Sequence, residues 1–182
     1  IVNVTDSNSC QTFDFININE PPAIILSTTA DSNVTCNGGS DGGATVTIIS
    51  GGIAPYDYSW SSGGSTLGSA DTTNSEIGLP AGTYTISITD ANGCTAADSV
   101  TISEPSAIVL TTGSLPDTAG SSLGIAWVIV SGGTLPYSYQ WSDPSLQTND
   151  TAFNLLAGNY MVEVTDANGC KESSSVTVSD IL

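Results

Sequence analysis

A short sequence beginning with Asp and ending with Cys recurs three times along this chain. It runs from Asp6 to Cys10, from Asp90 to Cys94 and from Asp166 to Cys170, and each copy follows a run of alternating apolar and polar residues. The cysteines are 84 and 76 residues apart. A fixed period of this length indicates tandem copies of one small domain.

Further landmarks keep the same order in successive copies. Residues 51–60 match residues 132–141 through Gly-Gly, Pro-Tyr and Trp, and residues 79–84 match 155–160 through Leu, Gly and Tyr. Glu20-Pro21 and Glu104-Pro105 each precede an apolar run, so the repeats are expected to join through very short connections containing proline. We therefore predict three segments: 1–22 is the last hairpin of a preceding repeat, 23–105 is a complete repeat, and 106–182 is a second repeat.

The periodicity of the apolar residues predicts an all-β fold. Tyr84, Ile86 and Ile88 alternate with polar residues, and no stretch has helical periodicity. About seven short strands per repeat, separated by turn residues, are typical of tandem immunoglobulin-like β-sandwich repeats.

Large aromatic residues are the expected core of these sandwiches. The Tyr of each Leu-x-x-Gly-x-Tyr element is predicted to form a tyrosine corner, in which its hydroxyl bonds back to the chain. Trp127 stands in the strand that precedes Gly132-Gly133, at the position that Val46 occupies before Gly51-Gly52. Since Val46 is expected to point inward, we expect Trp127 to point inward as well. The predicted core and structural residues are Trp60, Tyr84, Trp127, Trp141 and Tyr160.

The Asp-Ala-Asn-Gly turns are expected to be type I′ hairpin turns, because Asn and Gly both accept positive φ. This is the structural interpretation of Asp90 and Asp166. Residues 1–22 cannot bury an apolar face alone. We expect either upstream sequence, which the start in mid-strand favours, or a neighbouring molecule to complete them.

Charge excludes several classes of function. One Lys and no Arg against 18 acidic residues give a net charge of -17, and the chain has no His. Such a chain is repelled by nucleic acid and by anionic lipid, and no apolar run is long enough for membrane insertion. Without His, Arg or a Gly-rich phosphate loop, we expect neither an enzyme nor a bound cofactor.

The ordered landmarks together resemble the SprB-repeat family. The residues that carry this resemblance are Cys36, Asn37 to Gly42, Gly51-Gly52, Pro55-Tyr56, Trp60, Leu79 to Tyr84, Asp90 to Cys94, and Glu104-Pro105. The family implies very long bacterial surface adhesins exported by type IX secretion and associated with gliding motility. The resemblance therefore implies an extracellular or cell-surface location, outer-membrane attached or secreted, and covers essentially the whole chain. The later repeat departs from the pattern, because Asp117 or its neighbourhood replaces the Cys36 position.

Four cysteines allow three full pairings, and an exported protein can oxidise them. Cys94 should lie at one end of its sandwich and Cys36 near the other, about 30 Å away, whereas a disulfide needs Cα atoms within about 7 Å. A bond from Cys36 to Cys94 is therefore disfavoured unless the strand order differs from the one assumed. We expect a bond from Cys36 to Cys170, across the junction.

Two kinds of modification or ligand are also expected. Carboxylates near the junctions indicate a calcium site, although a solvated acidic surface is the alternative. The candidate calcium ligands are Asp6, Asp90, Asp166, Glu20 and Glu104. The resemblance also implies O-glycosylation at Asp-Ser/Thr sequences, with Thr118 and Thr151 expected in loops. The candidate glycosylation sites are Thr72, Ser99, Thr118 and Thr151.

Two functions fit this sequence. The first is a stalk or filament in which neighbouring repeats of the same chain, and possible further copies in a filament, are the partners. The alternative is a module that binds a glycan or a protein through end loops such as 61–74 or 143–150. Exposed Trp60 and Trp141 side chains would favour glycan binding, and buried ones would favour the stalk.

Overall fold

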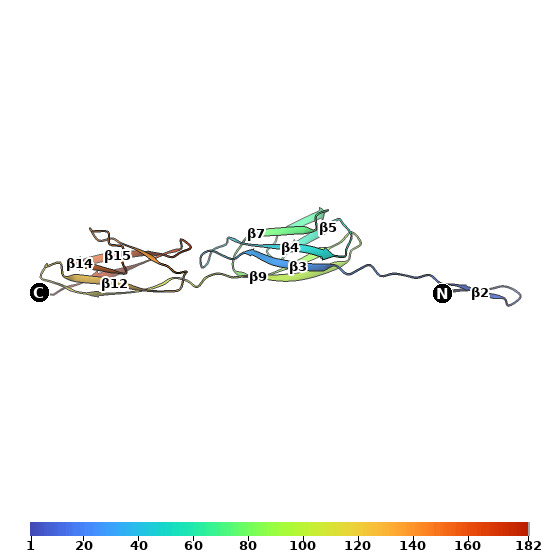
Figure 1. Cartoon of the computed structure of the whole chain (residues 1–182), viewed down its shortest axis with the longest axis horizontal. Helices are drawn as coiled ribbons and strands as arrows, with labels where there is room; N and C mark the ends of the chain where they lie inside the picture. Colours follow the sequence, from blue (N-terminus) through green and yellow to red (C-terminus); the bar gives the residue numbers. More distant parts are fainter. Residues whose placement is uncertain (182) are drawn as a thin grey trace.

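The computed structural model describes residues 1–181 and contains strands and turns without a helix in that range. Figure 1 shows a small hairpin at the N-terminus, an extended connection and two β-sandwiches, all lying roughly along one line. No described residue belongs to a helix long and apolar enough to cross a membrane.

The N-terminal hairpin consists of β1 (Val2–Thr5) and β2 (Gln11–Asp14), which pair antiparallel. Its apolar side chains stay exposed: Val4 is 57% exposed, and Phe13, 64% exposed, has an edge contact with Phe15. The chain from Phe15 to Pro22 then runs without regular structure to the first sandwich.

The first sandwich has a sheet of three strands facing a sheet of four, and all its strand pairs are antiparallel. The three-stranded sheet has the order β3 (Ile25–Ser32), β4 (Gly42–Ser50), β7 (Thr73–Leu79). The four-stranded sheet has the order β6 (Ser65–Ser69), β5 (Tyr56–Trp60), β8 (Gly82–Thr89), β9 (Thr95–Ile102). These are the seven strands that the turn spacing predicts.

The second sandwich has the same plan but lacks a strand equivalent to β6. One sheet has the order β10 (Val109–Leu115), β12 (Gly124–Ser131), β14 (Thr151–Leu155), and the other has the order β13 (Ser138–Trp141), β15 (Gly158–Thr165), β16 (Lys171–Val178). A short parallel pair, β11 (Asp117–Thr118) with β17 (Asp180–Ile181), closes the far end.

Alternation along the strands places the core between the sheets, as expected. Ile86 and Ile88 are fully buried in the first sandwich, and Val162 and Val164 occupy the matching positions in the second. Trp60 and Trp141 are 3% and 0% exposed. Their ring N–H groups donate to Asn74 Oδ1 and to the Asn149 carbonyl, both at 2.8 Å, so each buried donor has a partner.

Both predicted tyrosine corners are present. The Tyr84 hydroxyl donates to the Pro80 carbonyl and the Tyr160 hydroxyl donates to the Leu156 carbonyl, each at 2.9 Å. Each bond fixes the chain where it enters the penultimate strand. The aromatic rings are partly buried and pack against the two cores, so ring and hydroxyl both hold each tyrosine in place.

The prediction for Trp127 is wrong by one residue in register. The buried side chains of β12 are Ala126 and Val128, and Trp127 lies on the outer face of its sheet. There the indole covers Gly113 of β10, where a Cβ would lie 2.4 Å from the ring. A one-residue shift exchanges the two faces of a strand, and the sheet has an irregularity between Gly124 and Ala126.

The predicted type I′ turns are also wrong in detail. Gly93 and Gly169 have φ of 81° and 83°, but Asn92 and Asn168 are not among the residues with positive φ. A single left-handed residue after two ordinary ones gives the three-residue hairpin with a glycine bulge.

Candidate functional site: the joint between the two sandwiches

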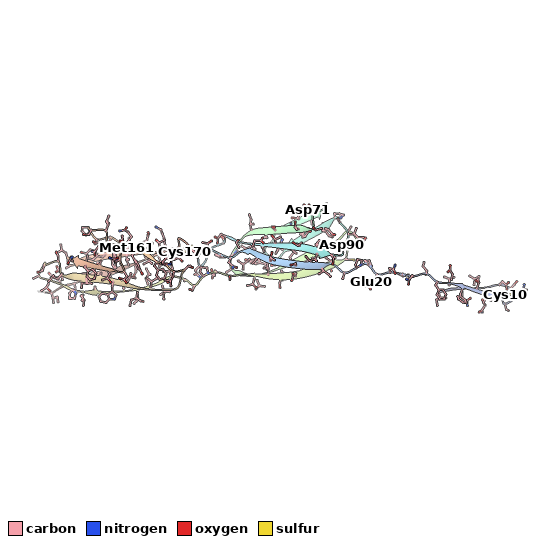
Figure 2. The ribbon with its side chains drawn as sticks, in the orientation of Figure 1. Cys10, Glu20, Asp71, Asp90, Met161 and Cys170 are labelled. Atoms are coloured by element: carbon pink, nitrogen blue, oxygen red, sulfur yellow. A yellow bond between two sulfur atoms is a disulfide. The ribbon has the colours of Figure 1, made fainter. Side chains whose placement is uncertain are left out.

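The joint is formed where the chain leaves β9 and enters β10. On one side lies the loop between β3 and β4, which contains Cys36, and on the other lies the hairpin turn after β15, which ends in Cys170. Figure 2 places Cys170 at the end of its sandwich that faces the other one. It places Asp90, from the equivalent turn of the first sandwich, at the opposite end of that sandwich, next to the N-terminal connection.

A disulfide crosses the joint. Cys36 and Cys170 are bonded, with their Cα atoms 5.6 Å apart and a separation of 134 positions in sequence. This is the pair named in the sequence analysis, and the strand order places Cys36 and Cys94 at opposite ends of one sandwich. The bond joins the loop between β3 and β4 of the first sandwich to the turn between β15 and β16 of the second.

Hydrogen bonds reinforce the same contact from both sides. The loop holds the connecting segment: Gly38 N donates to Glu104 Oε2 at 2.6 Å, and Asn37 Nδ2 donates to the Pro105 carbonyl at 3.1 Å. The turn holds the loop, because Asn168 Nδ2 donates to the Thr35 carbonyl at 3.1 Å. The joint therefore has three kinds of link: the peptide chain, the disulfide and side-chain hydrogen bonds.

Gly132 and Gly133, the second copy of the recurring Gly-Gly pair, hold the connecting segment against the second sandwich. Gly132 has a φ of 75° and approaches Ala107 so closely that a Cβ would lie 1.9 Å from its carbonyl oxygen. Gly133 N donates to the Ser106 carbonyl at 2.8 Å. Only glycine combines this conformation with this approach, so the segment lies fixed against the sandwich that it enters.

Asp166 shapes the turn that presents Cys170. Its Oδ1 accepts the backbone N–H groups of Asn168 and Cys170, both at 2.9 Å, and its Oδ2 accepts that of Thr134 at 2.9 Å. Burial opposes ionisation, but the backbone donors outweigh it and hold the pKa of Asp166 below its ordinary value. Asp90 has the matching bonds and a lowered pKa for the same reasons.

A small cavity of about 170 Å³ lies in the joint. It is lined from both sandwiches and from the connecting segment, and Cys36, Ser106 and Cys170 are among its walls. Each sandwich has its own buried core, so no continuous core runs through the joint among the described residues.

The structure does not bring the five expected calcium ligands together. Asp6, Asp90 and Asp166 each belong to a different hairpin turn, and their carboxylates accept backbone N–H groups of their own turns. Glu104 binds Gly38 N, and Glu20 lies in the N-terminal connection. Among the described residues, no group of three or more His, Cys, Asp or Glu is arranged to hold a metal ion.

The four expected glycosylation sites lie on or beside strands. Thr72, just before β7, and Ser99, in β9, are exposed. The prediction that Thr118 and Thr151 lie in loops is wrong, because Thr118 is in β11 and Thr151 begins β14. The Thr151 hydroxyl also donates to Asp150 Oδ1 at 2.9 Å.

Comparison with known proteins gives one family. The model of the SprB repeat matches residues 28–65 and 120–146, one segment in each sandwich. The chain contains SprB repeats. No curated protein matches it significantly.

Three solved structures illustrate what this chain is similar to. A C-terminal 282-residue fragment of intimin, solved with the intimin-binding domain of its receptor, has 14% identity and a TM-score of 0.44, and the match covers 87% of this chain and 64% of that one. Fibronectin(III)-like modules of Clostridium thermocellum CbhA have 13% identity and a TM-score of 0.33, with 85% and 95% covered. The BSP domain of a biofilm-associated protein has 16% identity and a TM-score of 0.30, with 85% and 30% covered.

The two SprB repeats differ at the loop that carries Cys36. Val34 N and Asp117 N donate to the equivalent carbonyls of Ser103 and Ser179, so Asp117 takes the place of buried Val34 and not that of the cysteine. Cys36 lies two residues after Val34, and the residue two positions after Asp117 is Ala119. The second repeat thus has the turn cysteine of the joint but not the loop cysteine.

Sequence reasoning missed most polar residues of the joint. Thr35 had no expected role, and Asn37 and Asn168 were expected only as a family landmark and a turn residue, although Asn-Gly follows Cys36 and precedes Cys170. Asn and Gly beside a cysteine are ordinary turn residues. Their role in holding the joint is visible only from the contact between the loop and the turn.

Proposed function

We propose that this chain is part of a stalk in which SprB sandwiches are held end to end. The observation that carries this proposal is the joint: a disulfide between Cys36 and Cys170 and the bonds around Glu104 tie neighbouring sandwiches at a fixed contact. The linear arrangement in Figure 1 supports the same conclusion.

The SprB match supports an adhesin-type extracellular repeat region. A disulfide between surface loops fits an oxidising environment outside the cytoplasm. We further propose that the protein acts at a bacterial cell surface, where a spacer of many such units would carry a terminal binding domain away from the cell. A net charge of -17 would keep such spacers apart from one another and from anionic surfaces.

The family and the fold favour a non-catalytic role. The chain has no His or Arg. Its most conspicuous aromatic side chains, Trp60 and Trp141, are buried and hydrogen-bonded inside the sandwiches. They therefore do not form the exposed platform that a glycan site built on tryptophan would need.

Small-angle scattering tests the stalk. We expect the chain to give the pair-distance distribution of a rod, with a single maximum dimension that does not change with salt. The Cys36→Ser/Cys170→Ser variant should show a broader distribution, because its joint keeps only the peptide and the hydrogen bonds. A folded-back pair of sandwiches in the unmodified protein would overturn the proposal.

A further inference from the structure

The side of the second sandwich between β13 and β14 is open, whereas the same side of the first sandwich is closed. In the first sandwich twelve residues, 61–72, connect β5 to β7 and form β6 on the way. In the second only nine residues, 142–150, connect β13 to β14. They fold instead into a tight turn in which Asp143 Oδ1 accepts Gln147 N at 2.9 Å.

The missing strand leaves backbone groups of β13 facing outward. Trp141 N donates to Gln147 O, away from β15, and Ser142 N donates to Met161 O, toward it. Since backbone direction alternates along a strand, the N–H and C=O of Tyr139 also point away from β15. In the first sandwich the equivalent Tyr58 is paired with Thr66 of β6.

A groove lies beside this open edge. It has a volume of about 520 Å³ and is lined by Tyr137, Tyr139 and Phe153 together with the residues 148–151. Tyr58 is completely buried and its hydroxyl donates to the Asp71 carbonyl at 2.6 Å. Tyr139 is partly exposed, and its hydroxyl has no hydrogen-bond partner among the described residues.

In the first sandwich the equivalent edge is occupied by β6, which shows what kind of segment can pair there. β6 has the sequence Ser-Thr-Leu-Gly-Ser and runs antiparallel to β5, and the Thr66 hydroxyl accepts a hydrogen bond from Asn74 Nδ2 at 3.0 Å. An extended segment of mostly small polar residues, with its one leucine, Leu67, exposed, therefore fills this side of the fold without adding a bulky core residue.

Charge narrows the choice of partner. Asp150 lines the groove, and the described surface of the second sandwich offers one cation, Lys171, which is paired with Glu163 at 2.5 Å. A second copy of this chain also has a net charge of -17 and would be repelled. A segment with lysine or arginine beside the small residues would be attracted.

From these observations we propose that the open edge of β13 is a docking site for an extended, cationic peptide segment of a partner protein. The segment pairs with the backbone of Tyr139 as an added strand and places alternate side chains in the groove of Tyr137, Tyr139 and Phe153. This proposal goes beyond the stalk function, since the groove shares no lining residue with the cavity in the joint and would let a stalk unit bind a second protein.

The test uses the whole chain and a synthetic peptide. The probe has the sequence of residues 62–69 followed by two lysines, and it is titrated into isotopically labelled protein. We expect saturable shifts of the Tyr139 amide resonance and slower hydrogen exchange at that amide. The Tyr58 amide is the internal control and should not change, because β6 already occupies its edge.

Two variants separate strand pairing from simple attraction. Tyr139→Pro removes an N–H that points away from β15, and its affinity for the peptide should fall about tenfold or more. Phe153→Ser changes only an exposed groove side chain, keeps the edge, and should weaken binding less, so it serves where the proline variant does not fold. Binding that is equally strong in both variants and in the unmodified chain would overturn the proposal.

Other occupants would give different results. Shifts produced by a neutral oligosaccharide at Phe153, without protection of the Tyr139 amide, would identify a glycan groove and overturn strand pairing. Dimerisation in sedimentation experiments with shifts at the same residues would identify a second copy as the occupant, with the same consequence. Absence of saturable change with millimolar peptide would also overturn it.

Discussion

Removal of the disulfide across the joint should destabilise both sandwiches. The perturbation is the double variant Cys36→Ser/Cys170→Ser, which replaces each sulfur by a hydroxyl of similar size. In the chain-entropy model, closing a loop of 134 residues stabilises a protein by about 5 kcal/mol. This figure applies if both sandwiches unfold together.

If one sandwich unfolds while the other stays folded, the effective loop is about half as long. Residues 36–105 or 106–170 then form the constrained segment, and the same model gives about 4 kcal/mol for each. Because native disulfides typically contribute 2 to 4 kcal/mol, and about 1 kcal/mol moves the Tm of a domain of this size by roughly 4 to 8 °C, we expect Tm to fall by about 8 to 32 °C.

Differential scanning calorimetry provides the measurement, after non-reducing peptide mapping has established the bond. The matched control is Cys10→Ser/Cys94→Ser, which removes the two exposed free thiols and should leave Tm unchanged. Each single variant at the bond should lower Tm as much as the double variant does, because either change opens the same loop. A double variant within 2 °C of the unmodified chain would refute the reasoning.

Three smaller predictions concern single sites. Tyr84→Phe and Tyr160→Phe should each cost about 1 kcal/mol in urea unfolding, because each removes a hydroxyl bond to the chain, and a cost near zero would remove the stabilising role of the corner. Gly113→Ala should displace the Trp127 ring, shift the tryptophan fluorescence to longer wavelength and lower the free energy of unfolding by about 1 kcal/mol. In a Trp127→Ala background the same change should cost nothing, and a cost that persists there would contradict the contact. The lowered pKa of Asp166 gives stability that is present above its unfolded pKa of about 3.9 and is lost as pH falls through the folded pKa. The Tm of Asp166→Asn should therefore fall less steeply below pH 4 than that of the unmodified chain, whereas parallel curves would exclude this contribution.

The fold could be predicted from the sequence because its signals are local and repeated. Alternation around Ile86 and Ile88, the Leu-x-x-Gly-x-Tyr element and the Trp positions each depend on neighbours within one strand or one turn. Each of these patterns occurs in both repeats, so the interpretation of one copy can be checked against the other.

The register of β12 could not be predicted in the same way. Residues 124–131 read Gly-Ile-Ala-Trp-Val-Ile-Val-Ser, which is apolar at six successive positions, so alternation does not say which face is inside. The contact between Trp127 and Gly113 decides it, because the glycine makes room for an indole on the outer face. That contact joins two strands and is not visible in either one alone.

The joint was predicted in part. The distance between the ends of a sandwich was enough to favour Cys170 over Cys94 as the partner of Cys36. The roles of Asn37 and Asn168 depend on how two turns from different repeats approach each other. No pattern within a single repeat contains that information.

The crossed disulfide also decides which parts of the chain bear a mechanical load. Under tension between residues 23 and 181, the shortest covalent route follows β3 to Cys36, crosses the sulfur bridge, and continues from Cys170 along β16. Residues 37–169 lie off this route and are shielded from the pull. Even with β3 and β16 peeled away, the extendable chain is about 26 residues, or roughly 90 Å, whereas the uncrosslinked segment would stretch to roughly 550 Å. A single bond thus turns a pair of unravelling domains into a link of limited stretch.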